Sequence, residues 1–174
     1  MKRSIKVIAT TSIVSAMAVG SILFSADRAS AQVRGMEGSY LGGGVSAGVT
    51  NVDEDGSVLG GNIQGRLDAR ELPVSLRGAF LFNGDNSAIM PIVSYDVGVA
   101  PNTNLYVGGG YSFVLGRGES SLLGNQDAPV VTLGVETAVN PNVVLYGDAK
   151  LGIDAYKNSS GSAVSLQLGA AYRF

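Results

Sequence analysis

The chain has 174 residues, with 12 Lys and Arg against 14 Asp and Glu, a length that suits a single domain. Glycine occurs 25 times, about twice its average frequency, while charged residues make up only 15 % of the chain. Because cysteine and histidine are absent, disulfides, thiolate nucleophiles, Ser-His-Asp catalysis and the common zinc sites are all excluded.

Residues 1–31 have the layout of a secretory signal peptide. The opening MKRSIK carries three positive charges, and a mostly apolar stretch follows it. Ala29 and Ala31 are the small residues of an A-x-A cleavage site. We predict cleavage after Ala31, with an uncleaved membrane anchor as the alternative. The remaining domain, 32–174, has 8 basic and 13 acidic residues, and this net charge of −5 disfavours nucleic acid as a partner.

From residue 38 onward, the dominant hydrophobic pattern has a period of two, interrupted by clusters of Gly, Asn, Asp and Pro. This pattern predicts an all-β domain. Eight segments of about ten residues fit the pattern. They are 39–50, 58–68, 74–82, 88–98, 105–114, 129–139, 143–154 and 163–174.

The connections between these segments alternate in character. Every second connection is short and contains one proline, and the others are more polar or longer. The short ones are 69–73, 99–104 and 140–142, and the others are 51–57, 83–87, 115–128 and 155–162. Short turns on the periplasmic side and longer outward loops are typical of outer-membrane barrels. We therefore predict an eight-stranded antiparallel up-and-down transmembrane β-barrel.

Aromatic residues on one face of the segments fall near the two ends of the predicted barrel. The outer group is Phe82, Tyr111 and Phe113, and the inner group is Tyr95, Tyr172 and Phe174. Aromatic belts at both interfaces are typical of membrane barrels. Because lipid offers no partner for unpaired backbone groups, we expect the last segment to pair with the first.

The opposite face of the segments carries much of the charge. Arg173 and six further charged residues share the inward direction, and these six are three basic and three acidic: Arg66, Arg77, Lys150, Asp96, Glu136 and Asp148. An ion removed from water costs several kcal/mol unless it is partnered, so we predict that these six residues form an interior network. Glycines on the same face would make room for the long side chains.

Two hairpins resemble each other at an offset of 40 residues, each around a short proline turn. If both hairpins are centred on the proline, Asp96 faces Tyr106 and Glu136 faces Tyr146 across neighbouring strands. A buried hydrogen bond in each pair is the simpler interpretation. A catalytic acid–tyrosine device is the alternative.

The last segment carries a resemblance to a known family. Gln167, Gly169, Tyr172 and the terminal Phe174 have the spacing of the C-terminal signal of outer-membrane β-barrels. From about residue 38 to its end, the chain resembles the small eight-stranded OmpA/OmpX/Opa-like outer-membrane barrels. This resemblance implies a Gram-negative-type outer membrane, contact with outer-membrane lipid, and recognition of the C-terminal motif by the barrel-assembly machinery.

Three classes of function are compatible with such a barrel. The first is a structural or surface-interaction role in the cell envelope, and the alternative is a narrow porin-like channel for small solutes or ions. The third is an envelope enzyme, but similar barrels with enzymatic activity commonly use a histidine, which this chain lacks. We predict no cofactor or metal site and expect a monomer, and the sequence does not identify a surface ligand.

Overall fold

The computed structural model describes residues 35–50, 58–69, 71–84, 86–115, 121–157 and 161–174, so the predicted signal peptide lies outside the described residues. Every regular element in the described part is a β-strand. The strands are β1 (Tyr40–Gly48), β2 (Val58–Asp68), β3 (Val74–Asn83), β4 (Asn86–Ala100), β5 (Thr103–Val114), β6 (Ala128–Asn140), β7 (Val143–Gly152) and β8 (Ala163–Arg173). Their ends differ from the predicted segments by at most two residues. Within these ranges, no helix is long and apolar enough to cross a membrane.

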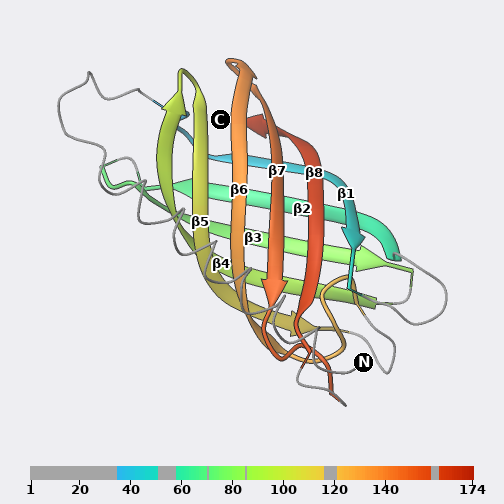
Figure 1. The fold of residues 1–174 in the computed structure, drawn as a ribbon. Helices are drawn as coiled ribbons and strands as arrows, with labels where there is room; N and C mark the ends of the chain where they lie inside the picture. The colour runs from blue at the N-terminus through green and yellow to red at the C-terminus, as the bar shows by residue number, and fades with distance from the viewer. Residues whose placement is uncertain (1–34, 51–57, 70, 85, 116–120, 158–160) are drawn as a thin grey trace, which may run out of the picture. The chain divides into compact units, whose positions relative to one another are not determined.

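Each strand pairs antiparallel with its neighbours in the chain, and β8 pairs with β1, so the sheet closes into a barrel (Figure 1). At this seam Tyr40 pairs with Arg173. When the paired residues are followed from Tyr40 through β2 to β7 in turn, they lead to Ala163 on β8. Ala163 lies ten residues before Arg173, the residue that pairs with Tyr40 directly. A stagger of this size tilts the strands by roughly 40° to the barrel axis. The prediction of an eight-stranded antiparallel barrel is confirmed.

Short turns join the strands at the end of the barrel where β1 begins and β8 ends, which we call the inner end. In the β4–β5 turn, Pro101 cannot donate a ladder hydrogen bond, and Asn102 adopts a left-handed φ of 57°. The β3–β4 connection at the outer end is also tight, with Gly84 at a φ of 50°. The connection 83–87, predicted to be more polar or longer, is polar but short, because glycine lets the strands pair right up to the turn.

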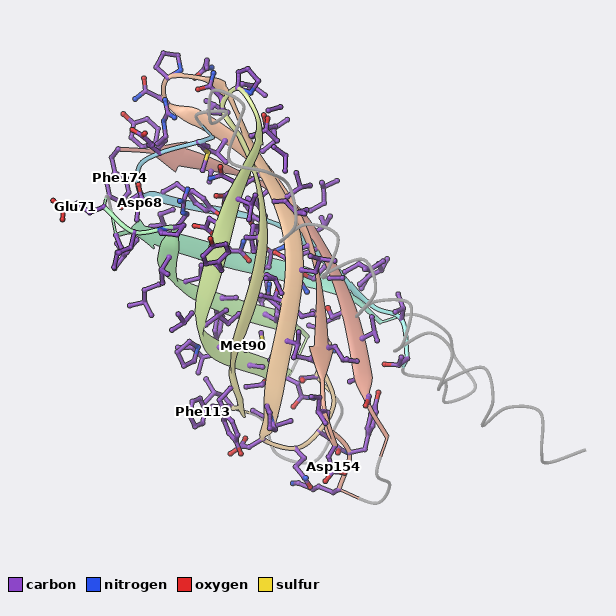
Figure 2. All side chains as sticks on the ribbon, turned by 60° about the vertical axis from the view of Figure 1, so that its left-hand side comes forward. Asp68, Glu71, Met90, Phe113, Asp154 and Phe174 are labelled. Carbon is purple, nitrogen blue, oxygen red and sulfur yellow. The ribbon has the colours of Figure 1, made fainter. Side chains whose placement is uncertain are left out.

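The outward face of the barrel is apolar on all eight strands. Its exposed residues include Leu41, Ile63, Leu76, Val93, Val107, Leu133, Leu145 and Leu168. The six predicted belt aromatics are exposed on the same face, and Figure 2 shows Phe113 and Phe174 at opposite ends of the barrel. An apolar band between two aromatic belts fits the hydrocarbon layer of a membrane.

Candidate functional site: the barrel interior

Four charged side chains from four strands meet inside the barrel near its inner end. Arg66 of β2 contacts Asp96 at 2.9 Å and Glu136 at 2.8 Å. Arg77 of β3 contacts the same two carboxylates, again at 2.9 Å and 2.8 Å. We call these four residues the charged ring. Between 0 and 7 % of each side chain is exposed, so each ion depends on at least two opposite charges to offset the loss of its hydration. Arg66 also contacts Asp68 at 3.3 Å.

Glu136 of β6 is contacted by four side chains. In addition to its two arginines, its Oε2 accepts a hydrogen bond from the Tyr40 hydroxyl at 2.9 Å, and its Oε1 accepts one from Asn104 Nδ2 at 3.1 Å. A carboxylate has about four acceptor sites, so these donors occupy them all. This geometry suits a structural ion pair rather than a general base, which needs a free acceptor for a substrate proton.

A second polar cluster lies beside the charged ring, on its outer side. Lys150 Nζ contacts Asp148 at 2.5 Å and donates a hydrogen bond to Gln64 Oε1 at 3.3 Å. Tyr106 links this ion pair to the ring. Its hydroxyl donates to Asp148 at 2.8 Å, and the Arg77 guanidinium lies 3.6 Å from the centre of its aromatic ring. The six charged residues therefore lie together as a ring of four and a separate pair joined by a tyrosine.

The two tyrosines of the repeated hairpins make different hydrogen bonds from those expected. The strand register places Tyr106 opposite Asp96 and Tyr146 opposite Glu136. The Tyr106 hydroxyl nevertheless donates to Asp148. The Tyr146 hydroxyl donates to Asn62 Oδ1 at 2.5 Å, on the far side of the lumen. The expected acid–tyrosine hydrogen bonds are wrong. A tyrosine is long enough to cross so narrow a lumen, and both carboxylates turn to the arginines.

A short segment before β1 closes the inner mouth of the barrel, and the sequence analysis did not find it. The Met36 side chain is only 2 % exposed and packs against Tyr40, Val144 and Tyr146. The Asn104 side chain holds the Met36 backbone on both sides, accepting from its N–H at 2.9 Å and donating to its carbonyl oxygen at 2.7 Å. No period of two extends into this segment, so the sequence offered no pattern to place it.

The outer half of the lumen contains an apolar cluster, beside buried polar residues such as Ser112 and Ser165. Leu81, Met90 and Ile92 point inward from β3 and β4, and Leu122 and Leu123 of the β5–β6 connection fold back onto them. We call this last pair the outer cap. The expectation of a polar interior therefore holds for the inner half and only in part for the outer half. Alternation shows which face points inward, but it does not show where along the strand the inward residues change from polar to apolar.

Backbone contacts between two outer loops hold the outer cap in place. The N–H groups of Asn125 and Gln126 donate to the carbonyl oxygen of Ala155 at 3.0 Å and 3.2 Å. Gly124 has a φ of 97°, and a Cβ at this position would collide with Ala155. Part of the connection between β5 and β6, the outer cap, therefore fills the outer mouth of the barrel.

The four residues of the C-terminal motif lie on or directly after the closing strand, β8. Gln167 is buried in the lumen, and Tyr172 and Phe174 are exposed on the outward face. A Cβ at Gly169 would collide with the ring of Tyr146, which explains the glycine by packing alone. The N–H of Phe174 donates to the carbonyl oxygen of Ser39 at 3.0 Å, so the end of the chain also helps to close the barrel.

Two further predictions concern a metal site and the signal cleavage site. Among the described residues, no cluster of acidic side chains could hold a metal ion. The predicted cleavage residues Ala29 and Ala31 lie outside the described ranges, and signal-peptide cleavage stays a prediction.

No known protein family matches this sequence, and no curated protein is detectably similar to it. Solved structures do share its fold. The crystal structure of Neisserial surface protein A matches with a TM-score of 0.56 and 20 % identity, over 79 % of this chain and 98 % of that one. The fold is that of the small eight-stranded outer-membrane β-barrels.

Two further structures show how far this likeness extends. A de novo designed transmembrane β-barrel matches with a TM-score of 0.53 and 16 % identity, over 79 % of this chain and 96 % of that one. Ail, the attachment invasion locus protein of Yersinia pestis, matches with a TM-score of 0.49 and 19 % identity, over 80 % of this chain and all of that one. The designed barrel thus matches nearly as well as Neisserial surface protein A, so the likeness supports the fold and not a particular role.

Proposed function

We propose that this protein is a non-conducting barrel of a Gram-negative-type outer membrane with a structural or surface-interaction role. The observation that carries the proposal is a lumen filled in three successive layers: Met36 at the inner mouth, the charged ring above it, and the outer cap at the other end. Water and solutes would have to displace all three layers to cross. The proposal includes export through the signal peptide and insertion as a monomer.

A direct test of this proposal is conductance in planar lipid bilayers. The refolded protein, checked for its heat-modifiable gel migration, is expected to give no stable current, because the filled lumen leaves no continuous path for ions. A reproducible open level of fixed size would contradict the proposal and favour the narrow channel. Gel migration that does not change on heating would instead count against the membrane barrel itself.

The proposed role does not include catalysis. The chain has no histidine, and the donors around Glu136 occupy its acceptor sites. Neisserial surface protein A is named for a surface location, and a role in surface contact is compatible with the backbone hydrogen bonds that join the described parts of two outer loops here.

We further propose that the C-terminal motif is read during assembly, with Phe174 as its key residue. Replacing Phe174 by serine is expected to lower the amount of assembled, heat-modifiable protein in the outer membrane. The matched control is Phe113→Ser, the same change at an exposed aromatic of the opposite belt. If the two variants lose equal amounts of assembled protein, Phe174 acts only as an interface anchor and the assembly role is wrong.

A further inference from the structure

One part of the outward face is hollowed. A groove of about 380 Å³ crosses β3, β4 and β5 and is lined by Val74, Val93, Tyr95, Val107 and Gly109. The groove is continuous with the apolar surface that the barrel turns to lipid.

The groove exists because one outward position lacks a side chain. Gly109 pairs with Val93 of β4 and with Val131 of β6, both of which are exposed on the same face. A Cβ at Gly109 would have no neighbouring atom closer than 4.0 Å, so the position borders open space. The floor of the groove is therefore bare backbone, surrounded by apolar side chains.

The groove lies near the inner end of the barrel. Val74 is the first residue of β3, directly after an inner turn, and pairs with Tyr95 of the inner aromatic belt. Aromatic belts mark the depth of the lipid headgroups. One end of the groove is therefore at headgroup depth, and the rest extends into the hydrocarbon of the inner leaflet.

We propose that this groove is a binding site for one acyl chain of a phospholipid in the inner leaflet. A void against the barrel wall would forfeit dispersion contacts, and a flexible methylene chain can fill an irregular groove without leaving a polar group unpaired. Tyr95 at the rim places a hydroxyl-bearing side chain beside the headgroup region. The inference rests on the membrane embedding proposed above and adds a defined lipid contact to it.

The first experiment counts the phospholipids that stay bound during purification. Native mass spectrometry of the protein extracted in mild detergent is expected to show a retained phospholipid in the wild type. Gly109→Leu fills the groove and should lose this adduct. The matched control is Gly78→Leu, because Gly78 is another membrane-facing glycine with open space at its Cβ, on β3 and outside the groove lining. This control should keep the adduct.

A second experiment needs no substitution. A phospholipid with a photoactivatable group in its acyl chain, incorporated into vesicles with the wild-type protein, is expected to cross-link mainly to peptides containing Val93, Tyr95 or Val107. Cross-links spread evenly over the eight strands would overturn the proposal. An adduct that Gly109→Leu leaves unchanged, a retained lipopolysaccharide, or a second copy of the chain displaced by Gly109→Leu would also overturn it. Loss of heat-modifiable migration in the wild type would instead contradict the membrane embedding.

Discussion

Replacing Glu136 by alanine is expected to lower the free energy of unfolding of the barrel by about 3–5 kcal/mol. The substitution removes a carboxylate that contacts both arginines of the charged ring at 2.8 Å. Arg77 keeps only Asp96, whereas Arg66 keeps Asp96 and also Asp68 at 3.3 Å. The Tyr40 hydroxyl loses its acceptor. Buried charge left without its partner is the largest penalty that a single substitution in this interior can produce.

The measurement is reversible urea unfolding in lipid vesicles or detergent, with the heat-modifiable gel band as the folded fraction. The control is Thr132→Val, a nearly isosteric change at a buried residue whose hydroxyl has no hydrogen-bond partner in the described part of the structure. This variant should be neutral or slightly more stable. If both variants unfold at the same urea concentration, the charged ring does not stabilise the barrel.

Replacing Leu123 by aspartate is expected to expel the outer cap from the lumen. Leu123 is 0 % exposed and lies in the apolar cluster with Met90. An unpaired carboxylate is too costly to bury there, so the loop is expected to leave the mouth of the barrel instead. The lost leucine contacts should lower the free energy of unfolding by about 2–5 kcal/mol.

The chain has no cysteine, and this makes expulsion of the outer cap directly measurable. A Met90→Cys reporter inside the lumen (Figure 2) should resist a water-soluble thiol reagent when the cap is intact and react when Leu123→Asp is added. The matched control, Leu123→Met, conserves volume and should keep the reporter protected. Equal protection in all three backgrounds would show that the cap does not seal the outer mouth.

Much of the fold could be predicted because a membrane barrel repeats one simple rule along its whole length. Each strand alternates between the outward face and the lumen, and turn residues interrupt the alternation where strands end. This is why β2 begins and ends where its segment does, and why the inward direction of Arg66 and Glu136 follows from position alone. The period of two gives the direction in which a side chain points, but it does not give the side chain that it contacts.

The missed features all depend on contacts that the period of two does not encode. The predicted register correctly placed Tyr146 opposite Glu136. The Tyr146 hydroxyl, however, lies at the end of a long side chain that extends into the lumen, and it donates to Asn62 instead. Met36 and Leu123 belong to segments without alternation, and only the shape of the finished lumen gives them a place. In a barrel this narrow, contacts across the lumen decide the interior as much as contacts along the sheet.

The charged ring also has a consequence for the folding pathway. The donors to Glu136 of β6 come from β1, β2, β3 and β5, and β1 and β2 lie far from β6 in an open sheet. An incompletely closed sheet would keep these ions hydrated and apart. Dehydration of the charges and pairing of β8 with β1 must therefore happen together. Closure should be a cooperative step, with little population of open-sheet intermediates that already contain a dry interior.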